Sequence, residues 1–262
     1  MQRYFSYRMT WCFGDAPHLE TKLLEEEWKA LLKQGGLLVR NTFDFDQPTS
    51  SHFWYIIKDQ FNGFDGVTSK CRTKIRKADK NYTYRIIENN FLKENGYGIH
   101  KEVMQSYGYN TVSKDEYFAY FDPDNIECWG CFLNDTQEMV GFSINCLWED
   151  ACGYEFMAIL PKYKHNATYP YYGLVYAMNA YYLGQKQMKY VSDGSRSITE
   201  HSHIQDFLIQ NFNFRKAYCQ LEVHYKWWMK IAVNLLYPFR KIIPLQRVKA
   251  ILNMEAMQRG EK

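Results

Sequence analysis

The chain has 262 residues, of which 46% are hydrophobic, 18% aromatic and 23% charged, and its mean hydropathy is −0.50. This length allows one large or two small domains with an ample core. The formal net charge of +3 is too small to require a nucleic-acid partner, so any electrostatic argument depends on local clusters of charge.

The opening residues and the cysteines indicate in which cellular compartment the protein is expected. No secretory leader pattern opens the sequence, and no apolar run approaches the roughly 18 residues that a membrane span needs. The seven cysteines show no disulfide-like pattern, which agrees with a reducing compartment. We therefore expect a cytoplasmic protein without a metal site.

The first 81 residues are predicted to form part of a mixed α/β layer. Residues 3–7 predict a strand, and a helix with Pro17 in its first turn is expected from near Asp15 to Gly35. Residues 37–39 and 53–57 predict two further strands.

A basic helix is expected over residues 69–80. Arg72 and Arg76 lie one turn apart on one face, and four lysines surround them. Like charges at this spacing repel by a few tenths of a kcal/mol, so a bound anion would relieve them. A solvated basic face is the alternative.

The remaining elements follow in a clear order. A strand is expected at 82–88, helices at 91–107 and 114–121, and strands at 126–133, at 139–148 and from Gly153 onward. A helix at 170–184, opened by Pro170 and ended by Gly184, a strand at 189–196, a helix at 202–210 that ends at Asn211, and a strand at 217–223 complete the pattern. After Tyr225, two prolines divide a basic, aromatic tail into short helical pieces.

Polar residues gather at two places in this order. A strand, helix and strand in close succession predict a right-handed crossover between parallel strands, and ligands bind beyond the carboxyl ends of such strands. The polar residues there are Lys162, Lys164, His165 and Asn166 in one loop, and Asp193, Ser195, Arg196, Thr199, His201 and His203 in the other. We expect a binding site at these two loops.

The element order from Tyr82 resembles that of the acyl-CoA N-acyltransferase (GNAT) superfamily, and the pair Phe212-Asn213-Phe214 resembles a short motif before the last strands of that fold. The run Arg72-Thr73-Lys74-Ile75-Arg76-Lys77-Ala78 is similar to a helix of the Fem family of aminoacyl and peptidyl transferases, which are GNAT-like proteins with two modules in tandem. The resemblance implies an α/β fold, with a GNAT-like mixed sheet flanked by helices and a partial N-terminal half-module. The expected segments are 1–81, the GNAT-like 82–224, and the tail 225–262.

One departure from the GNAT pattern concerns the donor. GNAT enzymes that use acetyl-CoA carry a glycine-rich loop whose backbone N–H groups bind pyrophosphate at a helix N-terminus, but here no glycine occurs between Pro161 and Gly173. A side-chain anion site built from Lys162 and Lys164 could replace that loop. The Fem resemblance instead implies an aminoacyl-tRNA donor held by phosphate contacts from Arg72 and Arg76. Acyl-CoA and aminoacyl-tRNA both stay open as donors, and no cofactor is assigned.

Residue roles follow from the resemblance. GNAT enzymes often place a carboxylate on the central strand as a base acting through water, and Glu155 holds that position here; the alternative is a carboxylate paired with a neighbouring strand. Asp193 ends the next strand, where Ser195 and Arg196 would face the cleft, although Asp193 could pair with Arg196 instead. His201 and His203 lie where a helix begins and could contact a ligand.

These observations predict a transferase that moves an acyl or aminoacyl group to an amine by direct attack. The alternative is a non-catalytic binding or scaffold protein that keeps the fold without binding CoA. The Fem resemblance implies a lipid-linked amine as acceptor, with tRNA or another polyanion as partner. The tail has no acidic residue from 223 to 254 and carries Trp227 and Trp228, so we also expect contact with an anionic membrane surface, unless the tail packs on the protein's own core.

Overall fold

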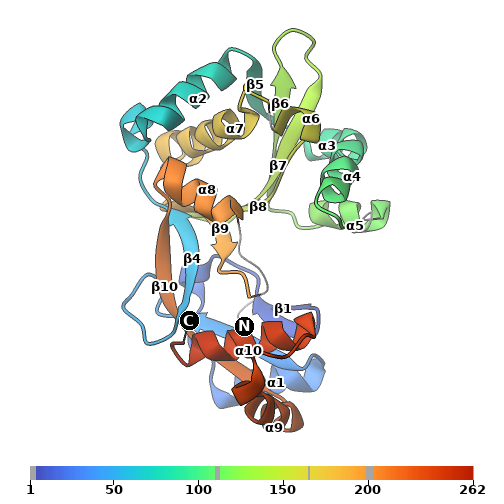
Figure 1. Cartoon of the computed structure of the whole chain (residues 1–262), viewed down its shortest axis with the longest axis vertical. Helices are drawn as coiled ribbons and strands as arrows, with labels where there is room; N and C mark the ends of the chain where they lie inside the picture. The colour runs from blue at the N-terminus through green and yellow to red at the C-terminus, as the bar shows by residue number, and fades with distance from the viewer. Residues whose placement is uncertain (1–3, 110–112, 165, 199–202, 262) are drawn as a thin grey trace. The chain divides into compact units, whose positions relative to one another are not determined.

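The computed structural model describes residues 4–109, 113–164, 166–198 and 203–261. Contacts divide the chain into two compact units (Figure 1). Unit 1 comprises Met1–Ile56, Ser195–Gln205 and Arg215–Lys262, and unit 2 comprises Ile57–Gly194 and Asp206–Phe214. This division differs from the three consecutive segments expected from the sequence, because C-terminal residues complete the sheet that the N-terminal residues begin.

Unit 1 is built on a sheet with the strand order β1-β2-β3-β10-β4. β2 runs parallel to β3, and β10 runs antiparallel to β3. The elements are β1 (Tyr4–Tyr7), β2 (Thr10–Phe13), the 3-10 turn η1 (Pro17–Leu19), α1 (Glu25–Gln34), β3 (Leu38–Phe43), β4 (Phe53–Lys58, whose last two residues belong to unit 2), β10 (Arg215–Tyr225), α9 (Trp227–Leu236), the 3-10 turn η5 (Tyr237–Phe239) and α10 (Gln246–Gln258).

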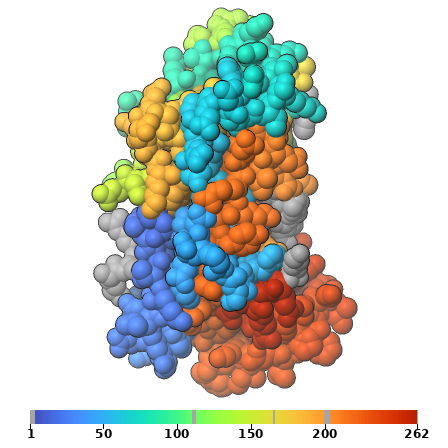
Figure 2. Space-filling model, turned by 90° about the vertical axis from the view of Figure 1, so that its left-hand side faces the viewer, coloured from blue at the N-terminus to red at the C-terminus, as the bar shows by residue number. Residues whose placement is uncertain are grey.

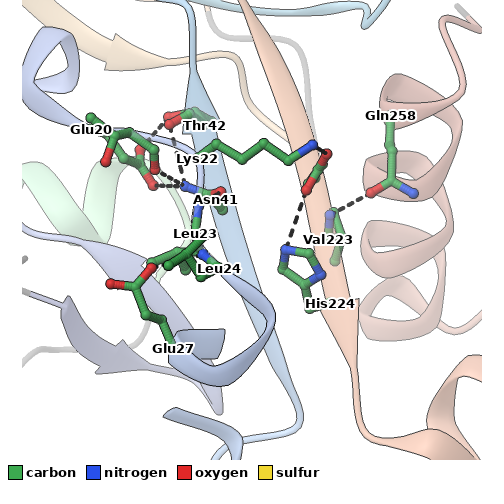
Figure 3. Close-up of polar contacts among 12 residues, drawn as sticks. Glu20, Lys22, Leu23, Leu24, Glu27, Asn41, Thr42, Val223, His224 and Gln258 are labelled. Atoms are coloured by element: carbon green, nitrogen blue, oxygen red, sulfur yellow. Dashed lines mark hydrogen bonds and ion pairs between the residues drawn. The ribbon is translucent and has the colours of Figure 1, made fainter. Parts of the chain in front are cut away.

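The helix expected from Asp15 to Gly35 is interrupted. The chain between η1 and α1 is held by β3 instead, where the backbone N–H of Leu23 donates to Asn41 Oδ1 over 2.9 Å. The buried carboxylate of Glu20 accepts hydrogen bonds from Asn41 Nδ2 (3.1 Å) and from the Thr42 hydroxyl (Figure 3). It also accepts one from the Tyr4 hydroxyl over 2.8 Å. A tertiary network therefore overrides the local helical pattern.

Unit 2 is built on a sheet with the strand order β9-β8-β7-β6-β5, in which β8 and β9 are parallel and the other pairs antiparallel. α2 and α7 lie on one face and α3 and α4 on the other (Figure 1). The elements are the 3-10 turn η2 (Gly63–Gly66), α2 (Ser69–Asp79), β5 (Tyr82–Ile87), α3 (Asn89–Asn95), α4 (Tyr97–Ser106), α5 (Lys114–Phe118), the 3-10 turn η3 (Ala119–Phe121), β6 (Ile126–Leu133), β7 (Met139–Leu147), β8 (Ala151–Ile159), α6 (Pro161–Lys164), α7 (Pro170–Asn179), a π-helical turn η4 (Ala180–Gln185), β9 (Tyr190–Ser195, whose last residue belongs to unit 1) and α8 (His203–Phe212, whose first three residues belong to unit 1).

The expected elements of unit 2 are present, with local differences that include α6 in the expected loop and the π-helical turn η4 at the end of the helix expected over 170–184. The helix expected over 91–107 is two helices that meet at Gly96, where a Cβ atom would lie 2.3 Å from the Tyr117 hydroxyl. The chain passes closely over that tyrosine at the break. α8 ends at Phe212, and Asn213, with φ of 56°, takes the left-handed conformation that we expected at Asn211.

Two further observations concern the chain as a whole. All seven cysteines lie within the described residues and none of them forms a disulfide there, and six of them are buried. Within the described ranges, no helix combines the length and apolar character needed to cross a bilayer.

Candidate functional site

The candidate site begins where two parallel strands of unit 2 separate. The register of β8 and β9 pairs residues 151–153 with residues 190–192. Beyond this pairing β8 continues to Ile159 and β9 to Ser195. Two acidic residues, Glu155 and Asp193, follow the last paired residues of their strands, at the carboxyl ends where ligands bind in sheets of this kind.

A β-bulge places Glu155 at this fork. In the register of β7 with β8, Ile144 faces Phe156 and Asn145 faces Tyr154, so Glu155 is an extra residue without a partner. The insertion reverses the alternation of the strand. The Tyr154 hydroxyl therefore donates to Asn179 Oδ1 of α7 over 2.8 Å, whereas Phe156 packs 4.8 Å from the His100 ring of α4.

A buried hydrogen-bond network supports the bulge. The Tyr182 hydroxyl accepts from Asn145 Nδ2 over 3.0 Å and from Trp129 Nε1 over 2.9 Å, and it donates to Glu127 Oε1 over 2.6 Å. Asn145 Oδ1 in turn accepts from the Ser143 hydroxyl over 2.7 Å. Because Asn145 is the residue at which the register shifts, this network holds the bulge in place.

The carboxylate of Glu155 lies over the backbone of Gly153. A Cβ atom at Gly153 would lie 2.9 Å from Glu155 Oε1 and 2.7 Å from the Trp148 ring, so only glycine leaves room for both side chains. Glu155 is exposed, so water reaches its carboxylate, even though the surrounding protein atoms raise its pKa above the ordinary glutamate value. Among the described residues, the buried indole Nε1 of Trp148 has no hydrogen-bond partner.

Asp193 is electrostatically coupled to Glu155. Burial, and after it the negative charge of Glu155, raise the pKa of Asp193 to about 7. A carboxyl group with a pKa near 7 exists in both its protonated and its ionised form near neutral pH, so Asp193 can take up and return a proton there, as acid–base catalysis requires.

The loop expected to bind an anion has other contacts. Lys162 Nζ lies 3.7 Å from Glu138 Oε1, and Lys164 Nζ donates to the Tyr107 hydroxyl over 2.8 Å. Asn166 Oδ1 accepts from the backbone N–H of Thr168 over 3.1 Å, which closes a local turn. The structure therefore places these three side chains in separate contacts, and His165 lies outside the described residues.

The second expected loop begins with Asp193 in unit 2 and continues in unit 1 from Ser195. The backbone oxygen of Ser195 accepts from Gln205 Nε2 over 3.1 Å, and Arg196 Nη1 donates to the backbone oxygen of His52 over 2.5 Å. Desolvation lowers the pKa of Arg196 below the usual arginine value. His203 is exposed at the first residue of α8, and His201 lies outside the described residues.

The basic helix α2 forms as expected, with the Thr68 hydroxyl capping it through the backbone N–H of Cys71. Its two arginines differ. Arg72 Nη2 donates to the backbone oxygen of Phe64 over 2.9 Å, whereas Arg76 is exposed, with its guanidinium 5.2 Å from the Phe64 ring centre. Arg72 therefore helps to hold the chain before α2, and Arg76 faces solvent.

Sequence reasoning did not single out two buried titratable residues. Lys58, the last residue of β4, is 6% exposed, and burial lowers its pKa. His100 in α4 is fully buried, and neither ring nitrogen has a hydrogen-bond partner within the described residues. A lysine that ends the apolar run Phe53–Ile57 was the available signal for Lys58, whereas only the packing of α4 reveals His100.

No protein-family model matches this chain, and no curated protein matches its sequence. Among solved structures, the chain is similar to FemX, with a TM-score of 0.55 and 10% identity over 83% of this chain and 72% of that chain. The fold is GNAT-like and Fem-like. The chain is also similar to L-PGS from Bacillus licheniformis, with a TM-score of 0.50 and 12% identity over 91% of this chain and 77% of that chain.

The likeness confirms the expected α/β fold class and the resemblance to Fem-like proteins. At identities of 10% and 12%, it concerns the fold alone. Within this GNAT-like, Fem-like fold, the roles of individual residues therefore depend on the geometry described above.

Proposed function

We propose that the protein is a transferase that moves an aminoacyl or acyl group onto an amine acceptor at the fork between β8 and β9. One observation carries the proposal: a β-bulge presents the exposed Glu155 just beyond the last paired residues of two parallel strands, coupled to an Asp193 whose pKa is raised to about 7. The Fem-like fold supports the same reaction class by analogy.

The proposed reaction needs no covalent enzyme intermediate. Glu155, directly or through water, accepts a proton from the ammonium form of the acceptor, and the free amine attacks the carbonyl carbon of the donor. The tetrahedral intermediate collapses with formation of an amide and cleavage of the ester or thioester bond. Glu155 releases this first proton to water. As the intermediate collapses, the attacking nitrogen loses a second proton, which passes through Glu155 and Asp193 to the leaving hydroxyl or thiol, so that both carboxyl groups return to their starting state.

Two observations favour aminoacyl-tRNA over acyl-CoA as donor. Gly173, the first glycine after β8, packs against β5, since a Cβ atom there would lie 2.1 Å from the Tyr84 hydroxyl. It therefore does not form a phosphate-binding loop, and Lys162 and Lys164 already contact other side chains. The exposed Arg76 and Lys77 of α2 offer phosphate contacts instead. The proposed acceptor is a lipid-linked amine, as the resemblance to Fem-like transferases implies.

Transfer of radioactive label tests the proposal. Purified protein is incubated with [14C]aminoacyl-tRNA or [14C]acetyl-CoA and a panel of soluble and lipid-linked amines. We expect amide formation from the tRNA donor, and Glu155→Gln should lower kcat by about 100-fold to 10,000-fold, the usual contribution of a general base, without changing donor affinity. Glu94→Gln, at an exposed glutamate of α3, is the matched control.

The result can also favour the alternative. If the intact protein binds neither donor and forms no amide with any acceptor, the protein is a non-catalytic member of this fold. If Glu155→Gln and Glu94→Gln have equal rates, the protein is a transferase whose base is not Glu155.

A further inference from the structure

Helix α9 of unit 1 has two apolar faces. Met229 and Val233 form one face and are buried. Trp227, Ile231 and Leu235, which follow one another at a spacing of four residues, form another, and they are 77%, 53% and 68% exposed. Side chains at this spacing line up along one side of a helix. An amphipathic surface helix would carry polar residues there, so α9 presents an apolar face that its own unit does not cover.

Exposed apolar residues continue along the chain beyond α9. Figures 1 and 2 show the dark orange to red segment of α9 and α10 at the surface of unit 1. We call this the α9 surface. Its large exposed residues are Trp227, Trp228, Ile231, Leu235, Leu236, Phe239, Ile242 and Leu245. Eight such residues within 19 positions exceed the scattered apolar side chains of an ordinary protein surface, and concentrations of this kind mark interaction sites.

Positive charge accompanies these apolar residues. No aspartate or glutamate occurs between residues 223 and 254. Lys230, Lys241, Arg247 and Lys249 are exposed in the same segment, whereas Arg240 forms an ion pair with Glu261. The α9 surface is therefore complementary to a partner that is apolar within and negatively charged at its boundary.

We propose that the α9 surface docks on an anionic lipid bilayer, with α9 lying in the plane of the interface. A bilayer offers acyl chains to the apolar residues and phosphate groups to the lysines at the same time. Tryptophan, present twice here, is enriched at this boundary. Since no described helix could span a bilayer, the contact is peripheral. The inference goes beyond the proposed function, because docking requires no transfer reaction.

Vesicle sedimentation tests the proposal with the full chain and without donor or acceptor, so its outcome is independent of catalysis. The probes are vesicles of phosphatidylcholine alone and vesicles that also contain phosphatidylglycerol. We expect binding to the mixed vesicles only, weakened by added salt. Lys230→Gln with Lys241→Gln should lower the partition coefficient by about 25-fold, since each lysine near an anionic leaflet contributes about fivefold.

The apolar face is tested by Ile231→Gln with Leu235→Gln, which should lower the partition coefficient more than tenfold. Leu19→Gln with Leu24→Gln, also exposed leucines of unit 1, is the matched apolar control, and Lys101→Gln with Lys189→Gln is the matched charge control. Neither control should change the partition coefficient. All changed side chains are exposed, so the melting temperatures should agree with that of the parent protein, which confirms folding.

Three outcomes would overturn the proposal. The intact protein could ignore both kinds of vesicle, or bind neutral and anionic vesicles equally. Alternatively, sedimentation equilibrium could show self-association that Ile231→Gln with Leu235→Gln abolishes, in which case the α9 surface contacts a second copy of the chain.

Discussion

Among the single residues, Asp193 best shows how position changes chemistry. An aspartate in an unfolded chain has a pKa of about 3.9. Burial and the nearby charge of Glu155 raise the pKa of Asp193 to about 7 in the folded protein. Between these two values the folded protein binds more protons than the unfolded chain, so the ionisation of Asp193 lowers stability progressively as pH rises from about 4 to about 7.

Asp193→Asn should therefore stabilise the protein relative to the parent, and more so at pH 8 than at pH 5, by a few kcal/mol at most. Urea unfolding at the two pH values measures the difference. Any hydrogen bond that the substitution alters contributes at both pH values, so the signal is the change between them. Asp122→Asn, at an exposed aspartate of unit 2, is the control. Equal effects of Asp193→Asn at both pH values would contradict a destabilised carboxylate.

At the scale of elements, the β-bulge decides where Glu155 points. Without the extra residue, strict alternation would place Tyr154 and Phe156 on the same face of the sheet. The bulge sends Tyr154 towards α7 and Phe156 towards α4, with Glu155 between them. The Tyr182 hydroxyl, which joins the buried Trp129 and Asn145 to the half-buried Glu127, is the atom on which this arrangement depends most.

Tyr182→Phe should destabilise the protein by about 2 kcal/mol, because Trp129 Nε1 would remain buried without an acceptor and Asn145 Nδ2 would keep only the weakly accepting Met178 sulfur. Urea unfolding measures the loss. Tyr176→Phe, which keeps the stacked ring beside Phe64 and removes a hydroxyl outside this network, is the control. A loss below about 0.5 kcal/mol for Tyr182→Phe, the range of ordinary surface substitutions, would show that the network does not support the bulge.

At the scale of the whole molecule, the net charge of +3 produces little long-range attraction for a polyanion. Binding of tRNA must therefore come from local clusters. Within α2, Arg72 is engaged by the backbone of Phe64, and Arg76 and Lys77 are exposed. Arg76 and Lys77 are adjacent, and together with the exposed Lys70 they are available to phosphate groups.

Arg76→Gln with Lys77→Gln should weaken binding of uncharged tRNA and reduce the slope of log Kd against log salt by about two, one for each lost phosphate contact. Filter binding over a series of salt concentrations measures this slope. Lys101→Gln with Lys189→Gln removes the same charge elsewhere on unit 2. If both double variants change the slope equally, α2 is a solvated basic face without a specific role.

Local signals in the sequence determined most of the elements. Alternation and turn residues predicted β6 and β7, and Pro170 with its apolar stripe predicted α7. The succession of strand, helix and strand also predicted a parallel pair of strands, with Glu155 on the first and Asp193 at the end of the second. These features were accessible because periodicity, caps and short crossovers depend on residues close together in the chain.

The tertiary structure alone decided the rest. The bulge at Glu155 depends on the register with β7, and the break before α1 depends on Asn41 in another strand. Unit 1 joins the N-terminal strands to β10, and α9 keeps one apolar face uncovered. Hydrogen bonds and burial between residues far apart in sequence set each of these features, and no local pattern of residue types specifies which distant partners will meet.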